Sequence, residues 1–273
     1  MSQSAERDYV LGTHDEEIVR LGVQHRVWRP VVLDCWQRAG ITVGSKVVDV
    51  GAGPGYATLD LGEIVGASGK VQAFERSTKF VTAARAVVKT RGCANIEVHE
   101  ADLMTDELPV TDFDFSWCRW VTAFVSSPEK LVGRISKLLR KGGTAIFHEY
   151  GAYDTWRFVP PRPAHEKFRG EIIDAWKASG GEPNIGLQLP SLLAAHGFGI
   201  SEVRPHIFPI RPSDYMWQWP ATFVDSSVDR FVELGSINRQ FADAVKAEFA
   251  EASTDSSSLM LTPLVLEITA RKQ

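Results

Sequence analysis

The sequence predicts an α/β protein built on an open, mostly parallel β-sheet with helices on both faces. One observation is an apolar run with a single acid, residues 47–50, which precedes three alternating glycines at positions 51, 53 and 55 and then a helical pattern. This order is typical of a strand, a tight turn and a helix. Further along, strand-like and helix-like segments alternate through residue 150, as they do in the βα units of a parallel sheet.

Composition limits the class of protein. With 273 residues, of which 44% are hydrophobic, the chain can bury the core of one enlarged domain or of one domain plus a cap. A net charge of -4 argues against a nucleic-acid-binding surface, which is normally basic. No apolar run is long enough to span a membrane, and the N-terminus lacks the apolar region of a signal peptide. We therefore expect a cytoplasmic protein without a nucleic-acid partner.

The cysteines indicate no cross-linked framework. Cys35, Cys93 and Cys118 are scattered and odd in number, so the sequence suggests neither disulfides nor a zinc site, and we expect no metal.

The glycine turn predicts a ligand with a nucleotide part. Glycine has no Cβ, so it accepts positive φ and lets a ligand approach the backbone, and the following helix start favours polar or anionic groups. A dinucleotide fingerprint requires G-x-G-x-x-G, but Tyr56 stands where its third glycine would be. An ordinary βα turn is the simpler alternative, because glycine and proline punctuate many loops.

Two later acids follow strand-like segments. Glu75 ends the strand predicted over 71–75, about 20 residues beyond the glycines, where a carboxylate can accept hydrogen bonds from both ribose hydroxyls. Asp102 follows the strand predicted over 96–99. Taken alone, Glu75 would be a surface carboxylate and Asp102 a turn residue.

The stretch D-V-G-A-G-P-G at residues 49–55 resembles motif I of the class I (Rossmann-like) S-adenosylmethionine (SAM)-dependent methyltransferases of the small-molecule type. Two later patterns follow in the order of that family. They are D-F-x-x-C-R, which comes after Phe113 within residues 113–119, and the L-R-x-G-G turn at 139–143. The resemblance implies a seven-stranded sheet whose last strand, near 264–270, is antiparallel. It also implies that SAM is the cofactor.

In that family the glycine loop surrounds the methionine part of SAM and the strand acid, here Asp49, orients the loop and the amino group. Glu75 would bind the ribose, Asp102 the adenine amine and Leu103 its ring. Helices before motif I close over the cofactor, so Tyr9, Gln24 and His25 could reach it, or could equally lie on solvated or core faces. The cofactor-binding residues that the resemblance implies are Asp49, Gly51, Ala52, Gly53, Glu75, Arg76, Asp102, Leu103, Cys118, Arg119 and Gln24.

The predicted organisation has six parts. Thr13 is the expected N-cap of the lead-in, and Gly22 is expected to end its first helix or to separate two helices. The parts are a helical lead-in over the cofactor at 1–40, a SAM-binding core at 41–150, a cap insertion at 151–186, a core helix and a sixth strand at 187–210, a second helical insertion at 211–258 and the last strand at 259–273.

The resemblance implies methyl transfer to a small acceptor. Both insertions are rich in aromatic residues, so the acceptor is expected to be partly apolar or aromatic, although core packing explains more than half of these side chains. No catalytic residue is assigned. Glu149 and Tyr150, at the end of the fifth strand, and His165, on the first insertion, are candidates for lining the acceptor pocket or acting as a base. The alternative functions are an NAD(P)-dependent oxidoreductase and a non-catalytic SAM-binding module. The sequence is also compatible with a homodimer.

Overall fold

The computed structural model describes residues 15–108 and 112–273. In chain order its elements are α1 (Asp15–Ala39), β1 (Lys46–Val50), α2 (Tyr56–Val65), β2 (Lys70–Glu75), α3 (Thr78–Arg91), β3 (Ile96–Glu100), β4 (Phe113–Arg119), η1 (Thr122–Phe124), α4 (Pro128–Leu138), β5 (Leu139–Ala152), η2 (Tyr153–Thr155), β6 (Arg157–Val159), α5 (Pro163–Ala178), η3 (Ile185–Leu187), α6 (Leu189–Ala195), β7 (Phe198–His206), β8 (Pro209–Ile210), η4 (Tyr215–Trp217), α7 (Gln218–Glu233), α8 (Arg239–Thr254), β9 (Leu259–Leu261) and β10 (Leu264–Lys272). Thr13 and Tyr9 lie outside the described residues.

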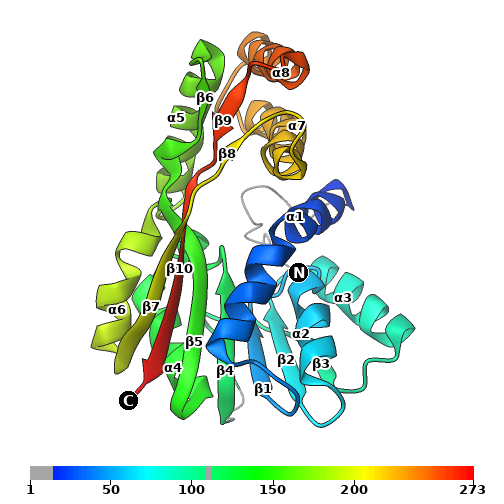
Figure 1. Ribbon diagram of the computed structural model, residues 1–273, viewed down its shortest axis with the longest axis vertical. Coiled ribbons are helices and arrows are strands. Elements are labelled where there is room, and N and C mark those ends of the chain that lie inside the picture. Colours follow the sequence, from blue (N-terminus) through cyan, green and yellow to red (C-terminus); the bar gives the residue numbers. More distant parts are fainter. Residues whose placement is uncertain (1–14, 109–111) are drawn as a thin grey trace, which may run out of the picture.

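The main sheet has seven strands in the order β3-β2-β1-β4-β5-β10-β7 (Figure 1). Strands β1 to β5 pair in parallel, whereas β10 runs antiparallel to both of its neighbours, β5 and β7. The predicted α/β fold with an antiparallel last strand is therefore confirmed. The carboxyl ends of β1, β2 and β4 meet at one edge, which is where open α/β sheets bind ligands.

Each face of the sheet has its own apolar core. On one face, Trp28 and Trp36 of α1 and Leu61 of α2 belong to a cluster that also contains Trp117 of β4. On the other face, α4 and α6 pack against inward side chains such as Phe147 of β5. Helices thus cover both faces.

Helix α1 is continuous through Gly22, contrary to the predicted break. A Cβ at Gly22 would lie 2.9 Å from the Tyr56 ring, and the Tyr56 hydroxyl donates a hydrogen bond to the Ile18 carbonyl at 3.0 Å. The glycine therefore serves close packing of α1 on α2. None of the described helices is long and apolar enough to cross a membrane.

The cap contains a small sheet that the sequence analysis missed. The predicted sixth strand, expected to run to residue 210, ends at His206, and Pro209–Ile210 pairs instead with β9 in a three-stranded sheet of order β6-β9-β8. Helices α5, α7 and α8 gather around this sheet beyond one end of the main sheet (Figure 1). The cap is therefore mixed α/β rather than helical alone.

Candidate active site

A cavity of about 600 Å³ opens at the carboxyl ends of β1, β2 and β4. Its wall includes the glycine turn, the residues that follow β2 and β3, the end of β4, and Leu21 and Gln24 of α1. Its volume falls within the usual range of about 300–1,000 Å³ for small-molecule and cofactor sites. The sheet topology and the glycine turn thus create a large hollow at the expected edge.

The glycine turn is held open by its backbone conformation and by Glu75. Gly51 and Gly53 have φ values of +68° and +55°. A Cβ at Gly51 would lie 2.4 Å from Val121, whereas a Cβ at Gly53 would meet no heavy atom within 4 Å. The Gly53 N–H donates to Glu75 Oε2 at 2.9 Å, and the Ser77 N–H donates to Oε1 at 2.8 Å. Glu75 therefore ties the turn to the end of β2.

Asp49 is the buried acid beneath the turn. It lines the cavity, and its Oδ2 accepts a hydrogen bond of 2.6 Å from the Thr58 hydroxyl. Burial raises the pKa of Asp49 to about 6, while the Thr58 hydrogen bond and the charge of Arg119 act in the opposite direction. A cationic group bound beside Asp49 would favour its ionised form.

Arg119 brings a positive charge to the same wall. Its Nη2 lies 3.1 Å from His25 Nδ1, and His25 Nε2 lies 3.1 Å from Asp60 Oδ2. A neutral His25 that donates to Asp60 accepts from Arg119, so the three groups form one directed chain. The other terminal nitrogen of Arg119, Nη1, is buried with no hydrogen-bond partner among the described residues. Burial lowers the pKa of Arg119 to about 10, so it stays charged at neutral pH.

The structure brings ten of the eleven predicted cofactor residues to this cavity. Cys118 is the exception: strand alternation turns it to the other face of the sheet, away from Trp117 and Arg119. Its thiol lies in the α4 and α6 core, 3.7 Å from the Thr122 hydroxyl. Burial raises the pKa of the Cys118 thiol well above the ordinary value. Because the side chain belongs to the core on the other face and not to the cavity wall, the expected position of Cys118 beside the cofactor is corrected. The ten residues are Gln24, Asp49, Gly51, Ala52, Gly53, Glu75, Arg76, Asp102, Leu103 and Arg119.

A second, aromatic cavity of about 60 Å³ lies beneath the cap. Its polar side chains among the described residues are Arg20, Gln24 and the two tyrosines. Its aromatic wall comes from both insertions and from the ends of β4 and β5: Trp120, Phe124, Tyr150, Tyr153, Trp156, Trp176, Trp219, Phe223 and Phe231.

Trp120 joins the two cavities. Together with Gln24 and Phe124 it belongs to both walls. Its ring stacks on Tyr150 and Trp219, with centroids 5.6 and 5.7 Å apart. Trp120 also has a φ of +52°, a left-handed conformation that is an outlier for a bulky side chain. Such backbone strain is concentrated at functional sites.

The structure places the three candidates for a base in different surroundings. Tyr150 lines the aromatic cavity. Glu149 lies outside both walls: its Oε1 accepts from the backbone N–H groups of Val121 and Thr122 at 2.9 and 2.7 Å. Burial raises the pKa of Glu149 to about 7. Its role is to anchor the loop after β4.

His165 also lies outside both cavities. Its ring packs against Trp156 and Phe158 in the cap, with centroids 4.5 and 4.7 Å away. Neither ring nitrogen has a hydrogen-bond partner among the described residues, and burial lowers its pKa to about 3. The structure therefore contradicts a role for His165 as a base at this site.

Comparison with known proteins finds similarity to methyltransferases. A family model described as a methyltransferase domain matches residues 47–143. The ubiquinone/menaquinone biosynthesis C-methyltransferase of Cronobacter sakazakii is 26% identical over 157 residues, which cover 54% of this chain and 61% of the relative. The chain thus spans a little over half the length of the curated relatives it matches.

Solved structures share the fold at low identity. A SAM-dependent methyltransferase from Mesorhizobium loti aligns with 92% of this chain and 100% of its own, with a TM-score of 0.54 and 20% identity. The phosphoethanolamine N-methyltransferase 2 of Haemonchus contortus, in complex with phosphomonomethylethanolamine and S-adenosylhomocysteine, covers 95% of this chain and 58% of its own, with a TM-score of 0.59 and 16% identity. Residues 47–143 match a methyltransferase domain, and the relatives and the shared fold support a class I, Rossmann-like SAM-dependent methyltransferase.

Proposed function

We propose that the protein binds SAM in the 600 Å³ cavity and transfers its methyl group to a small, partly apolar or aromatic molecule in the aromatic cavity. The observation that carries this proposal is the shared wall of Gln24, Trp120 and Phe124, which makes the two cavities adjacent. When bound, SAM supplies an activated methyl group on a sulfonium. Positioning and exclusion of water can then provide most of the rate effect.

The residues of the large cavity fit this cofactor. Arg119 presents a buried cationic nitrogen with no partner among the described residues, which suits the methionine carboxylate. Asp49 presents a buried carboxylate for the amino group. Gly53 faces open space where a ligand can approach the backbone. Glu75 and Asp102, on successive strand ends, suit ribose and adenine.

The acceptor class follows from the aromatic wall. Stacked and edge-on rings favour a flat apolar body, and an aromatic acceptor agrees with the quinone pathway named for the relative. A cavity that holds benzene measures about 150 Å³, so an aromatic acceptor requires the walls of this 60 Å³ cavity to move outward. The described wall contains no carboxylate or histidine, which favours an acceptor that needs no strong base from the protein.

The proposed activity is tested by incubating the full chain with methyl-labelled SAM and a bacterial metabolite extract. We expect mass spectrometry to find label in a small aromatic or apolar product. Trp120→Ala should lose transfer, because that side chain forms part of both walls. Stable SAM binding with no labelled product across extracts would favour the non-catalytic alternative.

Replacing Glu75 with alanine is expected to weaken SAM and S-adenosylhomocysteine equally. Both ligands share the ribose, and the lost hydrogen bonds to a carboxylate are worth roughly 1–3 kcal/mol. Calorimetry measures both affinities. Glu97→Ala is the control, because Glu97 is exposed on β3 and pairs with Lys70. A loss for SAM alone would place Glu75 away from the ribose.

SAM affinity is expected to fall in acid. The pKa of Asp49 is about 6 in the free protein, so below that pH the acid must release a proton before it pairs with the amino group. Between pH 7 and pH 5 the affinity should drop roughly tenfold, since one pKa unit corresponds to a factor of ten. Asp49→Asn should bind more weakly and lose this dependence. An unchanged pH profile in Asp49→Asn would assign the titration to another group.

A further inference from the structure

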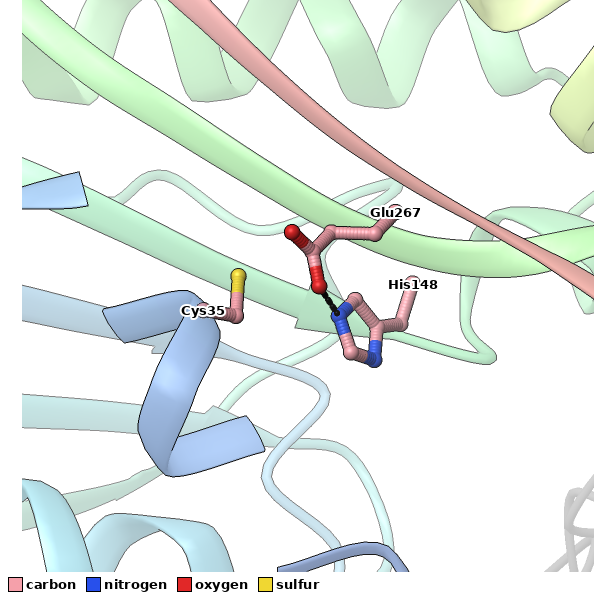
Figure 2. Close-up of side chains that lie close together, drawn as sticks. All are labelled: Cys35, His148 and Glu267. Carbon is pink, nitrogen blue, oxygen red and sulfur yellow. Dashed lines mark hydrogen bonds and ion pairs between the residues drawn. The ribbon is translucent and has the colours of Figure 1, made fainter. Parts of the chain in front are cut away.

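A buried cluster of metal-binding side chain types lies beneath α1, outside both cavities. Cys35 of α1, His148 of β5 and Glu267 of β10 converge there (Figure 2). The Cys35 sulfur, a His148 ring nitrogen and a Glu267 carboxylate oxygen all lie within 4.8 Å of one another. The three residues are 0%, 0% and 1% exposed. Their distant positions in the sequence give no spacing by which the cluster could be recognised.

A fourth donor lies beside them. His206 Nε2 is 3.0 Å from Glu267 Oε2, and His148 Nε2 is 3.1 Å from the same oxygen. Two nitrogen or oxygen ligands of a tetrahedral zinc ion, at about 2.0–2.1 Å from the metal, are roughly 3.3 Å apart. The two nitrogen-to-oxygen separations are therefore already close to those between two ligands of one zinc ion.

We propose that Cys35, His148 and Glu267 bind a divalent transition metal ion, with His206 as the fourth ligand and Zn²⁺ as the best fit. Thiolate, imidazole and carboxylate are the ligand types that zinc takes, and the mixture of soft sulfur with nitrogen disfavours Mg²⁺ and Ca²⁺. The two anionic ligands would balance the charge of the ion.

Arg38 supports the carboxylate from the outside. Its Nη2 donates to Glu267 Oε1 at 2.5 Å, which leaves Oε2 directed at the two histidines. Arg38 also pairs with Asp34 and Glu202, so its charge is shared among three acids rather than committed to Glu267. An outer partner that orients a ligating carboxylate is usual at metal sites.

The site would fasten α1 to the sheet. Cys35 is on α1, whereas the other ligands are on three adjacent strands, β5, β10 and β7. Trp28 of α1 packs edge-on against His148 and Trp120, with centroids 6.2 and 5.5 Å away. A bound ion would therefore fix the helix that carries Gln24 into both cavities. Its role would be structural, because neither cavity wall includes its ligands.

The test uses the full chain after removal of metals by a chelator. Zn²⁺ and Co²⁺ are titrated separately, and bound metal per chain, the near-ultraviolet thiolate-to-Co²⁺ absorption and the unfolding temperature are measured. We expect one tightly bound ion, a thiolate band and a higher unfolding temperature with Zn²⁺. Cys35→Ser should remove the band, and His148→Gln should weaken binding at least tenfold.

Cys118→Ser is the matched control, because Cys118 is an equally buried free cysteine on β4. It should bind Co²⁺ with the wild-type spectrum. Wild-type protein without the thiolate band, or a Cys35→Ser variant with the same band, would overturn the proposal and leave a hydrogen-bond network around Glu267. If Cys35→Ser does not fold, the His148→Gln spectrum compared with that of Cys118→Ser decides the matter.

Discussion

Gly53→Val is expected to abolish SAM binding while the protein stays folded. Gly53 has a φ of +55° and lines the large cavity, and nothing lies within 4 Å of the position that its Cβ would take. A valine side chain would therefore occupy ligand space rather than clash with the protein. The backbone strain of a non-glycine residue there costs about 1–3 kcal/mol. That cost is below the 5–15 kcal/mol of stability that is usual for a folded protein.

Gly92→Val separates this steric effect from strain. Gly92 caps α3 with a φ of +67°, also has open space around its Cβ, and does not belong to the cavity wall. It should lose similar stability in denaturant unfolding but bind SAM normally in calorimetry. Unchanged SAM affinity in a folded Gly53→Val protein would contradict the assignment of the glycine turn.

Arg119→Met is expected to weaken SAM binding by about 2–5 kcal/mol, which is at least roughly a thirtyfold increase in Kd. The reason is that the buried carboxylate of SAM would lose its charge partner. Methionine is unbranched and apolar like the arginine stem, but it lacks the guanidinium, which lies 5.8 and 5.2 Å from the ring centroids of Trp117 and Trp120. The change therefore removes mainly the charge and the hydrogen bonds. Calorimetric titration with SAM and with S-adenosylhomocysteine measures the loss, which should be similar for both.

Methylthioadenosine, which has neither the carboxylate nor the amino group, distinguishes lost recognition from a damaged site. It should bind Arg119→Met as well as it binds the wild type. Arg29→Met is the matched variant: Arg29 donates to Asp60 in the same chain of contacts but is exposed and outside the cavity wall. Equal losses for methylthioadenosine and SAM in Arg119→Met would show that Arg119 shapes the cavity rather than binding the carboxylate.

The sequence predicted the residues of the large cavity better than those of the aromatic cavity. Asp49, the glycines, Glu75 and Asp102 lie at or just beyond the carboxyl ends of three parallel strands, so their spacing along the chain already places them at one edge. The sequence also contains the information needed to place the Cys118 side chain. Side chains alternate along β4, so Cys118, the neighbour of Arg119, points to the opposite face of the sheet.

Other features depend on contacts between distant segments. Nothing local indicates that Trp120 adopts a positive φ, or that backbone N–H groups of the loop after β4 bind Glu149. The continuity of α1 depends on the contact between Gly22 and Tyr56 of another helix. The aromatic cavity combines rings from two insertions. Their composition alone does not tell which aromatic side chains line a cavity and which pack in the core.

The most direct test of the central claim is calorimetric titration of the purified full chain with SAM, S-adenosylhomocysteine and NAD(P)H. We predict one SAM and one S-adenosylhomocysteine site per chain, both lost in Gly53→Val, and no heat of binding with NAD(P)H. Binding of NAD(P)H with no binding of SAM would contradict the assignment of the 600 Å³ cavity.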